Sequence, residues 1–495
     1  MKNITSVKIR MYRPGLGDCF LLLFYAGKTL ACKMMIDFGT FGTKKNAADK
    51  MKEIANQISG EFKGSIDVLA ITHEHKDHLY GFHVAQPEFD AITAKEYWFA
   101  WTEKPGDGDA ASIKKELKKK KIALKKAATK IAALQAAAPT ALNKKLTGIK
   151  SIVENELNFQ GLVGAAGNKD ITAEALKYVK KRADEQPGSA KYFEPGEVTQ
   201  LPNVGNVEVF VLGPPRDAAK MKRMSSKKEG VMYLDELSMD SPKSYVNALE
   251  KIDEPYQQGS NDDLPFDSKY VMAAFSEKYT TKPFPHVAAD RAVTIDHYQD
   301  KDNRWRNIDN DWLMNADSLA MHIGNYTNNT SLALAFLLPT GDVLLFPGDA
   351  QLGNWESWPE NTFNAKDPLT NHKTDFTIDE LMRRTIFYKA SHHGSHNGTL
   401  KERGLELMNQ DKLVAMVPVD RKDPMTAQYN MPYTKLMNGL KRKTQGRLIR
   451  MDDGKTFLKT KPGDMPASVY TKFKSEVKFG PGTSDLYVEY TLKLT

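Results

Sequence analysis

The chain has 495 residues, 11 histidines, only two cysteines and a formal net charge of +8. A hydrophobic share of 41% beside 27% charged residues is typical of a soluble globular protein with two or three domains, or one large domain with insertions. Two cysteines exclude a disulfide framework, and no segment reaches the ~18 consecutive apolar residues of a membrane span. We therefore expect a cytoplasmic protein without membrane contact, whose positive charge favours a polyanionic partner.

The first hundred residues predict an order of three strands, a helix and a fourth strand. The strands are expected at 7–12, 19–25, 33–38 and 66–71, and the helix at 46–58. This order indicates a mixed α/β fold rather than a helix bundle.

The strand at 66–71 is followed directly by the most distinctive motif of the chain, Thr72-His73-Glu74-His75-Lys76-Asp77-His78. On an extended backbone His73 and His75 project to the same side, because side-chain direction repeats every two residues. Asp77 and His78 can turn toward a second, nearby point. Imidazoles with a carboxylate suit a divalent transition metal such as zinc, manganese or iron. The alternative is a polar loop that is rich in histidine by chance, which this spacing disfavours.

After residue 108 the chain becomes rich in lysine and alanine. Leu117, Leu124 and Ile131 recur every seven residues, which predicts an amphipathic helix or half of a helical hairpin. The four lysines at 118–121 are expected to form a solvated face. Contact with phosphates and docking on a protein partner are the alternatives.

We divide the chain on these patterns into a core with two insertions. Residues 1–100 form the first half of the core, and 101–200 are a helical insertion outside it. A core strand is expected in 201–215, and the polar, weakly periodic stretch 216–315 is a second, irregular insertion. Clear strands return in 316–495, which form the second half of the core.

Two later apolar strands also end in residues that can bind metal. One strand leads into Pro347-Gly348-Asp349, and another ends at Lys389 and leads into Ser391-His392-His393-Gly394-Ser395-His396. Loops at strand ends are where α/β scaffolds hold reactive groups. A single aspartate at such a position is usually a turn residue. Three strand ends with metal-type ligands indicate one shared site.

These motifs resemble those of the metallo-β-lactamase fold superfamily of hydrolases. The resemblance implies an α/β protein with a four-layered αβ/βα sandwich, into which the two insertions are set. The family's first, second, fourth and fifth motifs are matched by Asp37; by His73, His75, Asp77 and His78; by Asp349; and by His392 or His393.

One motif departs from the family. Many members place a third histidine ahead of the bridging aspartate, whereas this chain has Asn328-Asn329-Thr330-Ser331 there, and His322 is expected to pack or to contact solvent. The Asn-x-Ser pattern, Gly-Leu-Gly-Asp near the start and His-His-Gly-Ser near the end resemble one branch. That branch is the metallo-hydrolase domain of bacterial competence DNA-uptake proteins, with its stand-alone relatives. Uptake across a membrane is not implied.

The resemblance implies a role for each matching residue. His73 and His75 would hold one of two divalent ions, zinc or manganese. Asp77, His78 and one of His392 and His393 would hold the other, and Asp349 would bridge the two. Asp37 would not bind the metal itself but would fix the tautomer or the geometry of a metal ligand. Asp77 could also orient the nucleophile.

Five further residues are candidates for substrate contact. Asn329 and Ser331 would face the ligand-poor first ion or a substrate oxygen. Ser395, His396 and Lys389 would contact a phosphate or protonate the leaving group, with a plain surface lysine as the alternative for Lys389.

Two cations about 3.5–4 Å apart suit in-line displacement at phosphorus by a metal-activated water. The resulting hypothesis is a metal-dependent phosphodiesterase or nuclease that acts on DNA, with single-stranded DNA as the first substrate to test. One alternative is a small phosphodiester, such as a cyclic nucleotide or a phosphorylcholine-type ester. The other is a partner-regulated effector of a bacterial defence or toxin system, docking through residues 109–145.

Overall fold

The computed structural model describes residues 1–42, 45–137, 140–162, 169–224, 315–409, 411–463, 465–480 and 485–494. The chain divides into two compact units, each made of separate stretches of sequence. The first unit comprises residues 1–115, 158–239 and 324–495, and the second comprises 116–157 and 240–323. Most of the insertion expected at 216–315 lies outside the described residues.

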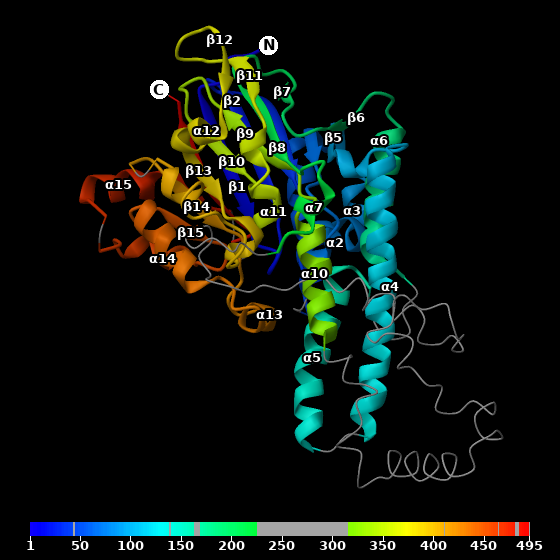
Figure 1. Cartoon of the computed structure of the whole chain (residues 1–495). Helices are drawn as coiled ribbons and strands as arrows, with labels where there is room; N and C mark the ends of the chain where they lie inside the picture. The colour runs from blue at the N-terminus through cyan, green and yellow to red at the C-terminus, as the bar shows by residue number, and fades with distance from the viewer. Residues whose placement is uncertain are drawn as a thin grey trace, which may run out of the picture. The chain divides into compact units, whose positions relative to one another are not determined.

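The first unit contains an eight-stranded mixed sheet with the order β16-β17-β1-β2-β3-β4-β5-β6 (Figure 1). Its strands are β1 (Ser6–Tyr12), β2 (Phe20–Ala26), β3 (Thr29–Ile36), β4 (Ser65–Ala70), β5 (Thr93–Ala100), β6 (Ala190–Phe193), β16 (Val477–Phe479) and β17 (Tyr487–Lys493). β3 to β6 run parallel to one another, and β1 pairs antiparallel with β17. With α1 (Ala47–Phe62) between β3 and β4, the predicted order of the first hundred residues is confirmed.

A seven-stranded mixed sheet of the same unit has the order β15-β14-β13-β10-β9-β8-β7. Its strands are β7 (Val198–Gln200), β8 (Glu208–Gly213), β9 (Ala333–Leu337), β10 (Val343–Phe346), β13 (Thr385–Lys389), β14 (Val414–Val417) and β15 (Leu448–Arg450). β10, β13, β14 and β15 are parallel, so the loops that follow them leave the sheet at the same edge. β11 (Phe363–Lys366) and β12 (Lys373–Phe376) form a separate hairpin.

The two sheets pack face to face across one apolar core. Phe20 packs edge-on against Phe346, and Phe24 lies against Phe336. Each of these pairs joins one aromatic ring from either sheet. Burying such a side chain contributes about 1.5–3 kcal/mol relative to leaving it exposed. Strands that are buried on both faces of their sheet are nearly continuous apolar runs, as β10 is.

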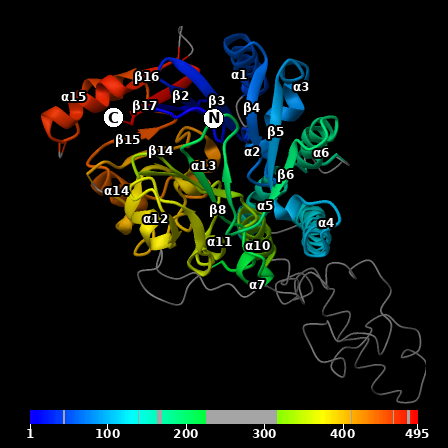
Figure 2. The same ribbon diagram turned by 90° about the horizontal axis from the view of Figure 1, so that it is seen from above.

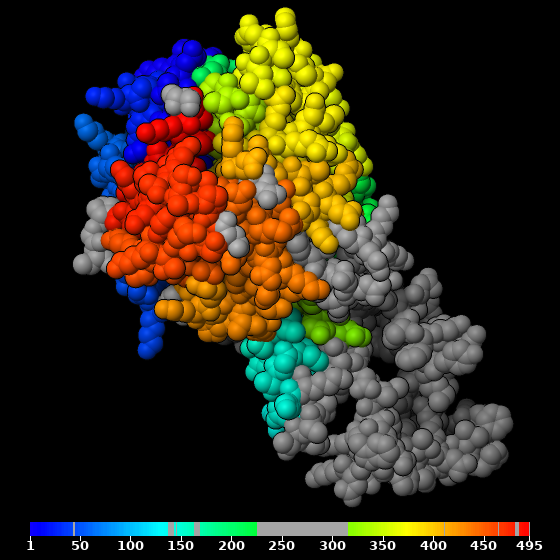
Figure 3. All heavy atoms as spheres, turned by 90° about the vertical axis from the view of Figure 1, so that its left-hand side faces the viewer, coloured from blue at the N-terminus to red at the C-terminus, as the bar shows by residue number. Residues whose placement is uncertain are grey.

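Helices cover the outer face of each sheet (Figure 2). On the first sheet these are α1, α2 (Lys76–Val84), α3 (Gln86–Phe89) and α6 (Ile171–Asp184). On the second they are α11 (Leu352–Trp355), α12 (Ile378–Arg384), α13 (Pro424–Gln428) and α14 (Thr434–Lys443). The layers follow the order helix, sheet, sheet, helix, and the predicted mixed α/β class is confirmed. The C-terminal part of the chain, coloured orange to red, forms much of one face of the first unit and includes α15 (Ala467–Glu476) (Figure 3).

The sequence fixes the start of helix α12, which leads directly into the strand β13 that ends at the candidate site. Thr377 and Glu380 form a capping box, in which each side chain accepts a hydrogen bond from the backbone N–H of the other residue. The helix ends at Arg384, and β13 begins at the next residue. The cap thus fixes where the helix starts. The helix is short, and β13, which ends at Lys389, follows it without a loop.

Residues 101–200 are only partly a separate insertion. Within this stretch, residues 116–157 belong to the second unit, whereas α6 and β6 belong to the first, where β6 pairs with β5. The expectation that all of it lies outside the core is wrong, because the chain returns to extend the first sheet by one strand.

The lysine- and alanine-rich stretch is helical, as predicted. It forms α4 (Gly108–Ala137), and α5 (Thr140–Phe159) follows it. Leu124 and Ile131 are fully buried. Lys120 is buried as well, with Nζ 2.6 Å from His322 Nε2, so the solvated face does not include it. In the part of the chain that the structure describes, no helix combines the length and the apolar character needed to span a bilayer.

Candidate metal centre

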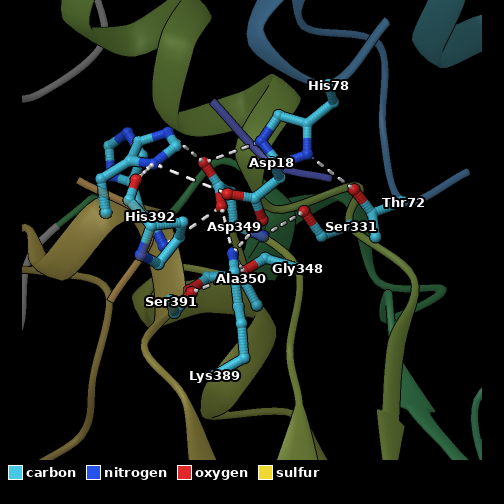
Figure 4. A network of polar contacts seen from close by, with 12 residues as sticks. Asp18, Thr72, His78, Ser331, Gly348, Asp349, Ala350, Lys389, Ser391 and His392 are labelled. Atoms are coloured by element: carbon cyan, nitrogen blue, oxygen red, sulfur yellow. Dashed lines mark hydrogen bonds and ion pairs between the residues drawn. The ribbon is translucent and has the colours of Figure 1, made fainter. Parts of the chain in front are cut away.

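Loops from both sheets of the first unit meet at the candidate site (Figure 4). Asp18 lies in the turn between β1 and β2, and Asp37 directly follows β3. The histidine motif connects β4 to α2. Asp349 follows β10, and His393 follows β13. Parallel strands end at the same edge of a sheet, which is why residues so distant in sequence converge.

Four side chains form one tight, buried group, called the metal-type group below: Asp18, His78, Asp349 and His393. Their ligand atoms all lie within 4.8 Å of one another. Nε2 of His78 is 3.2 Å from Oδ2 of Asp349, and Nε2 of His393 is 3.4 Å from the same oxygen. Asp77 lies beside them, with Oδ2 2.7 Å from Nε2 of His393. This group of buried residues could bind a metal ion.

Hydrogen bonds behind the two imidazoles set their tautomers. Nδ1 of His78 donates to Oδ2 of Asp37 at 2.7 Å, and Nδ1 of His393 donates to the carbonyl oxygen of Pro418 at 2.7 Å. Because both partners can only accept, the Nδ1 atoms carry the protons, and each Nε2 can present its lone pair to the centre. Asp37 also accepts hydrogen bonds from the backbone N–H and the hydroxyl of Thr72. It therefore fixes the motif at both ends.

His73 and His75 present a second pair of nitrogen atoms. Nε2 of His73 is 3.0 Å from Nδ1 of His75. Two nitrogens bound to one tetrahedral zinc ion, each about 2.0–2.1 Å from it, would be about 3.3 Å apart. The other nitrogen of His75, Nε2, lies 2.8 Å from the amide nitrogen of Gln160. The side chains of the two histidines thus lie side by side, with a nitrogen of each facing the other.

The charges around the centre are strongly coupled. Nζ of Lys389 is 2.9 Å from Oδ1 of Asp349, forms an ion pair with Asp18 and donates to the carbonyl of Gly348. Burial acts to raise the pKa of Asp349, but the charges of Lys389 and His78 outweigh burial and hold the pKa well below its usual range. Burial also acts to lower the pKa of His78, and the carboxylates of Asp349 and Asp37 outweigh it and raise the pKa. The positive charges of Lys389 and His78 therefore favour the ionised form of Asp349.

Unpartnered atoms of the centre test whether a cation fits. Among the described residues, two buried carboxylate oxygens here, Oδ1 of Asp18 and Oδ1 of Asp77, have no hydrogen-bond partner, and Oδ2 of Asp349 and Nε2 of His78 face each other at 3.2 Å without a hydrogen bond. Leaving a buried polar atom unpaired costs about 1–3 kcal/mol, and more for a charged group. All four are electron-pair donors of the kind that divalent transition metals take as ligands. The donor set fits a metal ion.

The structure distinguishes between the two neighbouring histidines. His393 belongs to the metal-type group. The ring of His392 is held by two amides, with Nδ1 2.7 Å from Nε2 of Gln351 and Nε2 3.2 Å from Nδ2 of Asn328. Both histidines have a positive φ, so the alternation of an extended strand does not apply to them.

Other predicted site residues take supporting positions. Lys389 is buried, so the alternative of a surface lysine is wrong. Ser331 accepts a hydrogen bond from the backbone N–H of Asp349, and Ser395 contacts Nδ1 of His392. These contacts orient the loops. His396 is half-buried with its ring against Tyr433.

Asn329 does not face the centre as expected. Its amide nitrogen donates to the carbonyl oxygens of Met221 and Arg223, and its amide oxygen accepts from the backbone N–H groups of Gln351 and Asn354. With its amide engaged in this way, the side chain is a structural clamp. The interpretation as a ligand or substrate contact is wrong.

Asp18 is the site residue that sequence analysis missed. Its backbone N–H donates to the carbonyl oxygen of Asp77, so its turn lies directly on the histidine motif. A Cβ on Gly17 would come within 2.6 Å of that same oxygen, which explains why glycine precedes the aspartate. The pattern Gly-x-Gly-Asp was a usable signal. It marks the resemblance to one branch but assigns no role to Asp18, because this aspartate precedes a strand, whereas the other acidic candidates follow one.

The fold and the site together define a mixed α/β protein with a buried carboxylate–imidazole centre. A scan against protein-family models and a search of curated proteins both found no match to the chain.

Proposed function

We propose that the protein is a metal-dependent phosphodiesterase or nuclease of the metallo-β-lactamase fold superfamily, with single-stranded DNA as its substrate. The observation that carries the proposal is the convergence of Asp18, His78, Asp349 and His393 into one buried group with unpaired donor atoms. The order helix, sheet, sheet, helix and the spacing of the histidine motif support membership in that superfamily.

Divalent cations bound by these residues would polarise a phosphoryl oxygen and lower the pKa of a water molecule. The chain's own residues prepare the centre for that chemistry. Asp37 holds the Nδ1 proton of His78, and Pro418 holds that of His393, so both Nε2 atoms stay available as ligands. Lys389 offsets part of the negative charge of Asp18 and Asp349, which reduces the cost of burying two carboxylates side by side.

The choice of a phosphodiester rests on three features. The sequence resembles a branch that handles DNA, the chain carries a net charge of +8, and a paired metal centre suits in-line displacement at phosphorus.

A small phosphodiester is the second candidate substrate, and the burial of the site favours it. His73 and His75 are each only 3% exposed, and the four grouped side chains are buried. Such enclosure is typical of sites that take a small ligand.

The test is hydrolysis by the purified protein in manganese or zinc. A labelled single-stranded oligonucleotide should be cleaved, and Asp349→Asn and His75→Ala should each abolish cleavage. His372→Ala provides a matched control, because His372 is exposed on the turn before β12. Cleavage of cyclic nucleotides or phosphorylcholine-type esters in place of DNA would select the second candidate. Binding of DNA without a metal-dependent product would contradict the proposal.

A further inference from the structure

A separate cavity of about 270 Å³ lies in the first unit. Its lining combines residues from the turn after β1, from α1 and from the loops after β14 and β15. The charged or glycine residues among them are Arg13, Gly15, Lys50, Asp420, Lys422 and Asp452.

Two loops connect this cavity to the metal centre. The first carries Arg13 and Gly15 at the cavity and Asp18 in the metal-type group. The second carries Pro418, whose carbonyl oxygen accepts the hydrogen bond from His393, and then Asp420 at the cavity. Chain geometry allows at most about 3.6 Å per residue. Gly15 and Asp18 are three residues apart and Pro418 and Asp420 are two apart, so the cavity and the centre are neighbours along both loops.

The cavity is suited to an anion. Nε of Arg13 donates to the carbonyl of Met451 at 2.6 Å, and Nη1 donates to the carbonyl of Asp485 at 3.1 Å. These neutral acceptors fix the guanidinium, and the carboxylate of Asp485 is 3.9 Å away. The side chain of Lys422 is exposed and makes no ion pair with any residue that the structure describes. The cavity is thus bordered by Arg13, whose guanidinium is held by hydrogen bonds, and by Lys422, whose exposed side chain can move toward a ligand.

The carboxylates of the lining do not cancel this charge. Oδ2 of Asp452 accepts hydrogen bonds from the backbone N–H of Arg421 and from its Nε, at 3.1 and 2.7 Å. Arg421 is therefore a further positive charge that compensates Asp452. The lining thus holds three basic side chains, those of Arg13, Lys50 and Lys422, and two carboxylates, those of Asp420 and Asp452. Lysine and arginine beside one another are the usual ligands of phosphate.

We propose that this cavity holds the phosphate group next to the scissile one on a nucleic-acid strand. The inference rests on the proposed function and deepens it, because it makes the substrate a strand with at least two phosphates. Contacts to phosphate position a strand without reading its bases, so binding here is independent of sequence and sensitive to salt.

The test measures binding without metal, which separates it from hydrolysis. Fluorescence anisotropy of labelled pentathymidylate in the presence of a chelator gives the Kd of the parent and of Lys422→Glu. The variant should raise the Kd about ten-fold and reduce the slope of log Kd against log salt by ~0.7 for a lost phosphate contact. The matched control is Lys373→Glu, which reverses the charge of an exposed lysine on β12. Equal Kd values and slopes for the two variants would overturn the inference.

Thymidine monophosphate identifies the source of the phosphate. If Lys422→Glu raises the Kd of the oligonucleotide but leaves the Kd of the mononucleotide, which the parent binds weakly, unchanged, the cavity binds a strand. If the mononucleotide binds as tightly as the strand and loses as much affinity in the variant, the cavity is a small-phosphate site and the strand assignment is wrong. Absence of hydrolysis of every phosphodiester would contradict the proposed function, and this binding experiment would still decide the role of the cavity.

Discussion

Nε2 of His393 lies 2.7 Å from Oδ2 of Asp77, although 316 residues separate the two in the chain. His393 follows a strand of the seven-stranded sheet, and Asp77 follows a strand of the eight-stranded one. The contact exists only when the two sheets are packed. Metal binding by this centre would therefore report correct tertiary structure, and metal affinity would measure the effect of substituting its residues.

Asp18→Asn should weaken metal binding. The substitution keeps the size of the side chain and removes its charge from a group in which Asp18, His78 and Asp349 lie within 4.8 Å of one another. We expect a loss in zinc affinity of about 10–100-fold. Competition with a chromophoric chelator measures it. Asp49→Asn, at an exposed position in the first turn of α1, is the control. Equal affinities for the two variants would show that Asp18 is only a turn residue.

His393→Ala and His392→Ala should differ in bound metal. His393 faces Asp77 and Asp349, whereas the ring nitrogens of His392 lie against the amides of Gln351 and Asn328. We expect elemental analysis to find a clear loss of metal in the first variant and the parent's content in the second. The reverse result would assign the ligand to His392 and contradict the arrangement of this loop.

Asp37→Asn should lower metal affinity by a less direct route. Asp37 makes no contact with the grouped ligand atoms and instead holds Nδ1 of His78 and the backbone of Thr72. An amide can turn its NH₂ group toward that nitrogen, which would favour the wrong tautomer of His78. We expect zinc affinity to fall about ten-fold. Asp37→Glu, which keeps the acceptor, should recover part of the loss. A variant with the parent's affinity would remove Asp37 from the supporting set.

Arg10→Met should destabilise the first unit. The guanidinium is 3% exposed and lies 2.8 Å from Oε2 of Glu489, whose side chain is 5% exposed. It also pairs with Glu61 and stacks on the ring of Tyr487. Removing the guanidinium leaves the buried carboxylate of Glu489 with Lys8, 3.5 Å away, as its remaining ion-pair partner, and breaking a buried pair in this way costs about 3–5 kcal/mol of the free energy of unfolding.

The control for Arg10 is an exposed ion pair. Arg403 and Asp379 are 56% and 40% exposed, so Arg403→Met should cost about 0–1 kcal/mol. Urea denaturation followed by circular dichroism measures both variants. Similar midpoints for the two would contradict the burial of the Arg10 network.

The two cysteines should be unreactive in the native protein. Both are buried, and burial raises the pKa of the thiols of Cys19 and Cys32. Because the thiolate is the reactive form, neither side chain should react with iodoacetamide at pH 8, and both should react in denaturant. Mass spectrometry counts the alkylated sites. Rapid alkylation of Cys32 in the folded protein would place β3 outside the core.

The sequence by itself determined the features that depend on local spacing. Alternating and apolar runs predicted the first four strands and α1, because strand and helix periodicities are written along the chain. The leucine and isoleucine repeat predicted α4. The alternation of His73 and His75 predicted that the two side chains would project to the same side, and a nitrogen of each lies 3.0 Å from the other.

Only the tertiary structure decided which side chains share the centre. Asp18 joins it because the turn after β1 packs on the carbonyl of Asp77, a contact that no local pattern encodes. Asn329 is excluded because backbone groups from two other segments, 221–223 and 351–354, occupy its amide. His393 rather than His392 lies against Asp77 and Asp349, and the left-handed backbone at both histidines removes the alternation by which a strand pattern could have distinguished them. Periodicity fixes the direction of a side chain only within a regular element, whereas positions in loops are set by the packing of the two sheets that hold them.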